Sequence, residues 1–111
     1  MVNQGEIWQA VLSPVQGREQ DGARPVLIIS GSLLNVKNEI VIVCPLTSKL
    51  KRYHENLRLE HSIQNGFDKT SEVLTRQIHT ISKTLLCKKV GSVPIVNVKK
   101  VHKTLNETLV Y

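Results

Sequence analysis

The amino-acid sequence predicts one small α+β or mainly β domain spanning residues 1–111, a barrel or roll of short strands with a C-terminal helix. Two observations support this prediction. Short runs rich in β-branched residues recur along the chain, separated by polar segments that contain glycine and proline. Towards the C-terminus, apolar residues instead recur every three or four positions, which is the period of an amphipathic helix.

Four segments have the composition expected of β-strands, because they are short and rich in Val, Ile and Leu or alternate in polarity. They are Glu6–Leu12, Pro25–Ser30, Ile40–Cys44 and Asn56–Glu60. A further segment, residues 72–81, has a mixed pattern. As a strand, it would direct four side chains to one face, those of Val73, Thr75, Gln77 and His79.

The intervening segments are polar. Residues 13–24 (SPVQGREQDGAR) lack a period and predict a long loop. Residues 31–38 predict a turn, and residues 47–54 predict a polar loop or an extension of the preceding strand. Asn65-Gly66 is a strong turn signal. The chain contains no internal repeat and no low-complexity stretch.

The most regular pattern lies near the C-terminus, where Ser92 and Pro94 are start signals for a helix. Its apolar stripe consists of Ile95, Val98, Val101, Leu105 and Leu109. We expect this stripe to cover the barrel. The opposite face, expected to meet water, carries Lys99, Lys100 and Lys103.

The chain is basic, with a formal net charge of +6 and a pI near 9.6. Residues 61–111 hold eight Lys and Arg against three Asp and Glu, whereas residues 1–60 hold seven against six. A small basic domain is typical of proteins that meet nucleic acid or an acidic protein. The C-terminal lysines are equally consistent with a plain solvated face.

Several classes of protein are not supported by the sequence. Cys44 and Cys87 lack CxxC spacing, so we expect no disulfide framework, and Cys44 is expected to be a buried small side chain. The four histidines are scattered and no phosphate-binding glycine motif occurs, so we expect neither a metal nor a nucleotide cofactor. No signal peptide or membrane-spanning run is visible. These features predict a soluble, cytoplasmic protein.

Several short motifs follow one another in a fixed order. They are Gly5-Glu6-Ile7-Trp8, the stretch SPVQGREQDGARPV at residues 13–26, VCPLTS at residues 43–48 and QIHTI at residues 77–81. In this order and at these distances, they resemble the MazF/PemK family of toxin endoribonucleases. The resemblance runs from about Gly5 to the C-terminus, and its most specific part is the SPxxGxEQxGxRPV pattern of residues 13–26.

The resemblance implies an SH3-like β-barrel with a C-terminal helix and a short additional helix, assembled as a homodimer. It implies metal-independent, sequence-specific cleavage of single-stranded RNA, here mRNA. It also implies an antitoxin partner whose flexible segment covers the RNA site, and the charge of +6 predicts that this segment is acidic and disordered. Two positions depart from the family pattern. Arg76 stands where an acidic residue is common, and His79 where a larger basic residue is usual.

The chemistry of RNA cleavage without a metal limits which residues can act. The 2′-hydroxyl is the nucleophile, so the protein must remove its proton and stabilise the negative phosphate. Arg24 suits the second task because its guanidinium stays charged and donates two parallel hydrogen bonds, and Thr47 can hydrogen-bond a phosphate oxygen. The resemblance implies that both are catalytic. Glu19 and His54 are the candidates for the general base.

The segment after Thr47 is the predicted RNA contact. Basic residues interleaved with an aromatic ring suit phosphate contacts and base stacking. The full set of predicted RNA-binding residues is Ser13, Gln16, Gly17, Gln20, Ser48, Lys49, Lys51, Arg52, Tyr53, Gln77 and His79.

Two alternative functions stay open. A non-catalytic RNA-binding module on the same SH3-like barrel would keep the basic loop, with Arg24 merely beginning a strand and Thr47 serving as a turn hydroxyl. A gyrase-targeting toxin of the same fold would act on a protein instead. That class depends on a C-terminal Trp-Gly-Ile ending, whereas this chain ends in Leu-Val-Tyr and its only tryptophan is Trp8. The gyrase alternative therefore ranks last.

Overall fold

The computed structural model describes residues 1–12 and 23–110. The strands are β1 (Glu6–Val11), β2 (Ala23–Ile28), β3 (Ile40–Thr47), β4 (Leu57–Leu59), β5 (Ser71–Val73), β6 (His79–Ser82) and β7 (Leu86–Ser92). The helices are α1 (Ser32–Lys37), α2 (Ile95–Val110) and two single 3-10 turns, η1 (Thr75–Gln77) and η2 (Lys83–Leu85).

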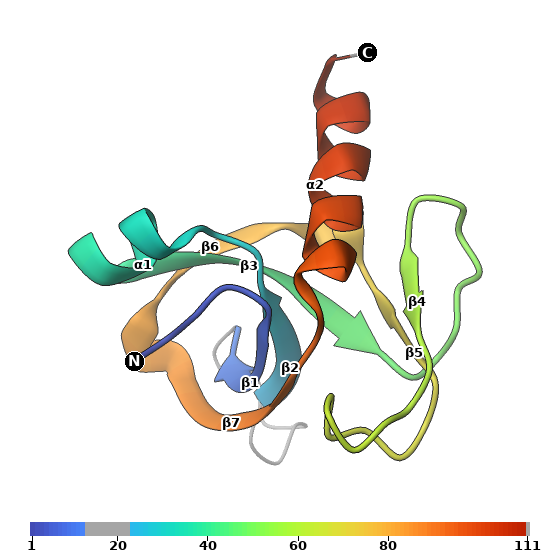
Figure 1. The fold of residues 1–111 in the computed structure, drawn as a ribbon, viewed down its shortest axis with the longest axis horizontal. Helices are drawn as coiled ribbons and strands as arrows, with labels where there is room; N and C mark the ends of the chain where they lie inside the picture. Colours follow the sequence, from blue (N-terminus) through green and yellow to red (C-terminus); the bar gives the residue numbers. More distant parts are fainter. Residues whose placement is uncertain (13–22, 111) are drawn as a thin grey trace.

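The strands form one antiparallel sheet in the order β4-β5-β3-β2-β1-β7, and β6 also pairs with β3. The sheet curls on one side of α2 (Figure 1). The predicted α+β class is thus confirmed. The sheet is not a closed barrel, because its pairing path ends at β4 and β7 among the described residues. The edge of β7 instead meets the turn at residues 62–67, where the Ser92 amide donates to the Gln64 carbonyl at 2.9 Å.

Both faces of the sheet are covered, which is why β2 and β3 are continuous apolar runs rather than alternating ones. Successive residues of β3 enter different clusters. One cluster contains Ile7, Leu27, Cys44, Leu46 and Val73 together with residues of α2. The other contains Ala10, Val26, Ile28, Val41, Val43 and Ile81. Cys44 is fully buried as predicted, and burial raises the pKa of its thiol to about 12.

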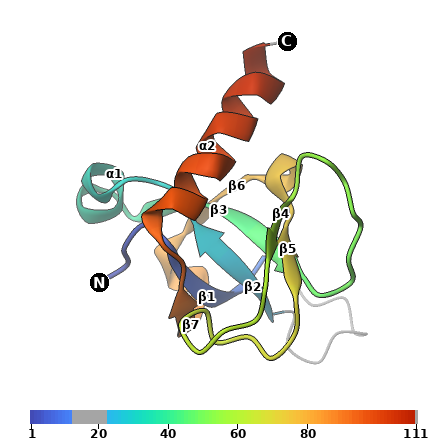
Figure 2. The same cartoon turned by 45° about the vertical axis from the view of Figure 1, so that its right-hand side comes forward.

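The C-terminal helix is confirmed as α2. Val98, Val101 and Leu105 are buried against the sheet, and all three predicted lysines are exposed. The two ends of the stripe differ from the prediction, because Ile95 and Leu109 are 51% and 79% exposed. Figures 1 and 2 show the reason at the C-terminal end, where the last turns extend past the sheet. Among the described residues, no helix is both long and apolar enough to cross a membrane.

The predicted turn at residues 31–38 is wrong, because residues 32–37 form α1. The helical turn depends on Asn35, which is buried although it is polar. Its side-chain oxygen accepts from the Ser30 hydroxyl, and its side-chain nitrogen donates to the Ser30 carbonyl at 2.9 Å. The Lys83 ammonium also donates to the Asn35 carbonyl. These tertiary contacts replace the apolar periodicity by which a helix is usually recognised.

The segment with the mixed pattern, residues 72–81, does not form a single strand. This segment forms β5, the 3-10 turn η1 and then β6, so Val73, Thr75, Gln77 and His79 do not share a strand face. The break arises because both strands pair with β3: β6 pairs with residues 40–43, and β5 pairs with residues 46 and 47. The chain must therefore step past Pro45 of β3, whose carbonyl accepts from the Leu74 amide at 2.8 Å.

The turn at Asn65-Gly66 is confirmed and packs tightly on β7. Gly66 has a φ of +78°, and a Cβ there would lie 2.3 Å from the Val90 carbonyl oxygen. A Cβ on Gly91 would lie 2.4 Å from the Asn65 backbone. Only glycine permits this approach on both sides. Strand β7 itself was not predicted, because Lys88 and Lys89 interrupt its alternation.

Candidate functional site

The two predicted catalytic residues lie on neighbouring strands, β2 and β3. The register pairs Val26 with Pro45. In an antiparallel pair, two residues back along β2 lie opposite two residues forward along β3, so Arg24 lies opposite Thr47. Pro25, next to Arg24, and Pro45, two residues before Thr47, cannot donate to a ladder, and the recorded pairing of the two strands ends at Val26 and Pro45. Two polar side chains distant in sequence therefore meet at the open end of a rigid strand pair.

Local hydrogen bonds orient both side chains. The Arg24 guanidinium donates from Nη2 to the Leu46 carbonyl at 3.4 Å. The Thr47 Oγ1 accepts from the Lys49 amide at 3.0 Å. Because the Thr47 Oγ1 accepts a hydrogen bond from the loop that follows it, its hydroxyl hydrogen can turn towards a bound anion. The arrangement supplies charged and neutral donors side by side.

Arg24 and Thr47 line a cavity of about 470 Å³, which we call the strand cavity. Its other polar walls are Ser48 and Lys49 after β3, Asp68 and Lys69 before β5, and Ser71 at the start of β5. Three cations thus face one carboxylate in this cavity. Such a surface attracts an anion such as a phosphate group.

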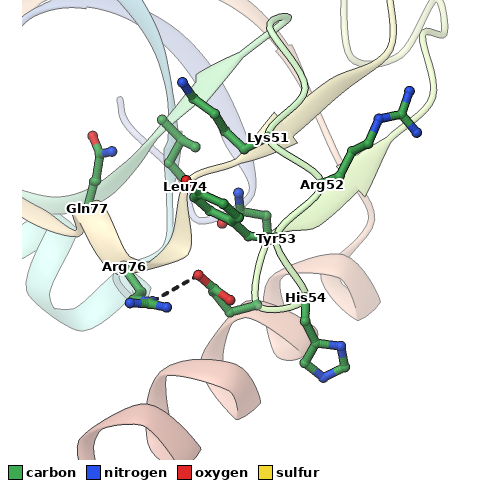
Figure 3. A pocket seen from close by; sticks show the side chains of 9 residues that line it. Lys51, Arg52, Tyr53, His54, Leu74, Arg76 and Gln77 are labelled. Carbon is green, nitrogen blue, oxygen red and sulfur yellow. Dashed lines mark hydrogen bonds and ion pairs between the residues drawn. The ribbon is translucent and has the colours of Figure 1, made fainter.

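A second cavity of about 640 Å³, which we call the loop cavity, lies at residues 51–56 and η1. Figure 3 shows its walls, formed by Lys51, Arg52, Tyr53, His54, Glu55, Asn56, Leu74, Arg76 and Gln77. Tyr53 is 58% exposed, so its ring is open to a stacking partner. The dashed line in Figure 3 is the ion pair between Arg76 Nε and Glu55 Oε2 at 2.9 Å.

The predicted site residues thus divide into four groups. Arg24, Thr47, Ser48 and Lys49 line the strand cavity, and Lys51, Arg52, Tyr53, His54 and Gln77 line the loop cavity. His79 is exposed at the start of β6 and lines neither. The remaining predicted residues lie outside the described residues, and these are Ser13, Gln16, Gly17, Glu19 and Gln20.

His54 does not share a cavity with Arg24 and Thr47. Its ring points away from Lys51 and Gln77 (Figure 3). It also lines a hollow on the other side of the loop, beside Lys100 and Lys103 of α2. A role as general base would therefore require a substrate that spans both cavities.

Sequence reasoning missed several residues that the fold brings to the site. Asp68 and Lys69 arrive through the connection between β4 and β5, and Glu55 and Arg76 through their ion pair. Glu72, which is 3% exposed, holds the backbone of residues 51 and 52. The charges of Glu55, Arg76 and Glu72 were visible, but their partners lie about twenty positions away and no local pattern reveals them. Within the described residues, no group of three His, Cys, Asp or Glu side chains could hold a metal ion.

A curated relative supports a common origin. Endoribonuclease MazF of Staphylococcus saprophyticus subsp. saprophyticus is 33% identical over 111 residues, covering 98% of this chain and 92% of the relative. The similarity therefore extends over both cavities and α2.

Solved structures have the same fold. MazF from Deinococcus radiodurans superposes with a TM-score of 0.78 at 21% identity, covering 99% of this chain and 97% of the other. An endoribonuclease in complex with its cognate antitoxin from Mycobacterial species gives a TM-score of 0.76 at 21% identity, covering 98% and 95%. The family model for PemK-like, MazF-like toxins of type II toxin–antitoxin systems matches residues 3–109. The chain belongs to this toxin family.

Proposed function

We propose that this protein is an endoribonuclease that cleaves single-stranded RNA at a short sequence and is the toxin of a toxin–antitoxin pair. The observation that carries the proposal is the meeting of Arg24 and Thr47 in one basic cavity, on a chain that belongs to this toxin family. The relative from Staphylococcus is named an endoribonuclease. A single-stranded substrate is favoured because its unpaired bases expose the edges by which a sequence is read.

In the proposed reaction, the 2′-oxygen attacks the adjacent phosphorus while the bond to the 5′-oxygen of the next nucleotide breaks. The products are a 2′,3′-cyclic phosphate and a free 5′-hydroxyl. Arg24 would donate hydrogen bonds to the non-bridging oxygens, which become more negative in the transition state. Thr47 would donate a hydrogen bond from its hydroxyl to the same phosphate and so fix the orientation of that phosphate. The substrate supplies the nucleophile, so this route does not require a metal-activated water.

Two groups are proposed for the proton transfers, Glu19 and His54. The 2′-hydroxyl must lose a proton, and the leaving 5′-oxygen must gain one. Whichever of Glu19→Gln and His54→Gln lowers the cleavage rate more at saturating RNA identifies the base.

The positions of the basic side chains support a course for the RNA strand. Lys49 and Lys69 flank Arg24 in the strand cavity, and Lys51 and Arg52 continue the positive charge into the loop cavity. Cations placed along a groove bind successive phosphates of single-stranded RNA. We therefore propose that the scissile phosphate occupies the strand cavity. The neighbouring nucleotides would lie in the loop cavity, with Tyr53 stacked on a base.

Analysis of the cleavage products tests this function directly. Purified protein in excess EDTA should cut a long single-stranded RNA at a recurring short sequence, mapped by primer extension. The fragments should end in a 2′,3′-cyclic phosphate or its 3′-phosphate hydrolysis product. Cleavage that stops with EDTA and returns with Mg²⁺ would contradict the mechanism. RNA binding without cleavage would favour a non-catalytic module.

We also propose an antitoxin partner whose binding segment is acidic and disordered. A structurally similar endoribonuclease is described in complex with its cognate antitoxin, and a chain of net charge +6 attracts an acidic segment. This segment would lie over residues 13–24 and 47–54 and occupy the phosphate sites. The purified complex should therefore lack nuclease activity and dissociate more readily as salt is raised.

The protein is further proposed to be a homodimer. Helix α1 supports this with two exposed apolar side chains, Leu33 at 73% and Val36 at 57%. Contact with a second copy would remove such side chains from water. Light scattering at micromolar concentration should give twice the chain mass of 12.5 kDa. A mass of one chain would contradict the proposal.

A further inference from the structure

Glu72 of β5 is a buried carboxylate directly beneath the loop cavity. It is 3% exposed, and the antiparallel register places it between Thr47 of β3 and Arg58 of β4. Directly opposed residues of neighbouring strands have their side chains on the same face. Glu72 is therefore a cross-strand neighbour of Thr47. Glu72 thus connects Thr47 of the strand cavity to the segment at residues 51–56.

Both carboxylate oxygens of Glu72 are used by the segment at residues 51–56. Oε2 accepts from the Arg52 amide at 2.8 Å, and Oε1 accepts from the Lys51 amide at 3.1 Å. Oε1 also accepts from the Asn56 side-chain nitrogen at 3.0 Å. Two consecutive backbone amides that converge on one anion form a nest. Here the anion is part of the protein itself.

The backbone at Arg52 is strained, which shows that the nest must be held in place. Arg52 has a φ of +61°, the left-handed region that a non-glycine residue adopts only at an energetic cost. Hydrogen bonds to a charged carboxylate are strong enough to offset such a cost. The conformation also fixes the directions of the side chains on either side of it. Those side chains include Lys51 and Tyr53, which line the loop cavity.

We propose that Glu72 is a positioning residue for RNA binding, because its carboxylate fixes the conformation in which residues 51–53 face the RNA strand. The inference rests on the proposed function. Glu72 touches the loop backbone and not the RNA, so it acts through Lys51, Arg52 and Tyr53. Its loss is expected to weaken substrate binding while the reacting groups in the strand cavity stay in place.

The ionisation of Glu72 agrees with this role. Burial alone would raise its pKa, but the hydrogen bonds from Asn56, Arg52 and Lys51, with the charge of Arg58, outweigh burial. They hold the pKa of Glu72 below the ordinary value of 4.5. The carboxylate is therefore charged at neutral pH and available to both amides.

The experiment compares Glu72→Gln with a matched control, Glu6→Gln. Glu6 is also a buried carboxylate, 7% exposed, and its oxygens accept from Asn3, Trp8 and Lys89 at 2.9–3.2 Å. It lies on β1 and lines neither cavity. Both variants replace one carboxylate oxygen by an NH₂ group that cannot accept a hydrogen bond. The readouts are KM and kcat on a fluorophore-labelled single-stranded RNA that the wild type cleaves.

Glu72→Gln should raise KM by about tenfold and change kcat by less than about twofold, because one charged hydrogen bond to the loop is lost. Glu6→Gln should lower the thermal midpoint but leave KM unchanged. Amide hydrogen exchange at residues 51 and 52 should accelerate only in Glu72→Gln. Equal KM values in the two variants, or unchanged exchange at residues 51 and 52, would overturn the inference.

A milder variant keeps the test decisive if Glu72→Gln does not fold. Asn56→Ala removes one donor to Glu72, so it should raise KM by about threefold with kcat unchanged. A wild-type KM in Asn56→Ala would then overturn the inference. Failure of the proposed function is distinguishable, since the wild type itself would not cut RNA. The amide exchange would in that case still report whether Glu72 fixes the loop.

Discussion

The strand cavity and the loop cavity are built differently. Arg24 and Thr47 are placed by the β2–β3 ladder, whose flanking residues belong to both apolar clusters. The loop cavity rests on residues 51–56 and one 3-10 turn, held by Glu72 and by the Glu55–Arg76 ion pair. A rigid ladder suits groups that must meet a reacting phosphate within a fraction of an ångström. A loop on a few polar contacts suits the reading of varied bases.

The largest expected effect separates chemistry from binding. Arg24→Ala should lower the cleavage rate by about 10²–10³-fold, the loss typical of one transition-state donor. RNA affinity, measured by fluorescence anisotropy, should fall by only about threefold, since one phosphate contact among several is lost. Lys88→Ala, an exposed cation that lines neither cavity, should leave both values unchanged. Wild-type cleavage by Arg24→Ala would mean that the strand cavity is not the catalytic centre.

The reverse pattern is expected in the loop cavity. Lys51→Ala combined with Arg52→Ala should weaken RNA binding by about tenfold or more at low salt and leave the rate at saturating RNA nearly unchanged. The slope of log affinity against log salt should fall by about 1.4, for two phosphate contacts to single-stranded RNA. The matched control is Lys88→Ala with Lys99→Ala, two exposed cations elsewhere. An equal loss in this control would show that only net charge matters.

Tyr53 tests whether the loop cavity holds a base as well as phosphates. Tyr53→Ala should weaken RNA affinity by about 1–2 kcal/mol, the value of one stacked base. Tyr53→Phe keeps the ring and should bind RNA as the wild type does. The slope against salt should be the same in all three proteins, because no charge is removed. Equal affinity for Tyr53→Ala and Tyr53→Phe would exclude stacking.

As the pH is lowered, the loop cavity should lose its fixed conformation before the strand cavity does. The pKa of Glu72 is below its ordinary value in the folded protein, so its contribution is present above pH 4.5 and is lost as pH falls through the lowered pKa. In NMR spectra, the amides of Lys51 and Arg52 should titrate below pH 4.5 while the amide of Val26 does not. Glu72→Gln should abolish this titration. A shared midpoint for all three amides would indicate global unfolding instead.

The same contrast explains how far the sequence could predict the site. Arg24 and Thr47 were found because they lie in recognisable motifs, and the ladder brings those motifs together. The partners of Glu72 and Glu55 could not be found, because each contact joins β5 or the turn after it to the segment at residues 51–56, about twenty positions away. The periodicity of a segment does not reveal which distant residues it contacts.

The fold, too, was predictable from the sequence only where local patterns decide the structure. The runs at β2 and β3 and the stripe of α2 are apolar, so burial decides their structure and the pattern reveals it. The family resemblance implied a short additional helix, but local patterns placed neither helix α1 nor strand β7, because the first depends on the buried polar Asn35 and the second carries Lys88 and Lys89. The step between β5 and β6 depends on the length of β3, which only the assembled sheet defines.

The contact between the Asn65-Gly66 turn and β7 limits how this chain can diverge. Backbone meets backbone there, since a Cβ at Gly91 would lie 2.4 Å from Asn65. Any side chain at position 91 would push the turn away from β7. Asp68 and Lys69 follow this turn and line the strand cavity, so they would move with it. Lys88 of β7, by comparison, is exposed and lines neither cavity. A glycine that does not line the strand cavity therefore helps to fix the position of one of its walls.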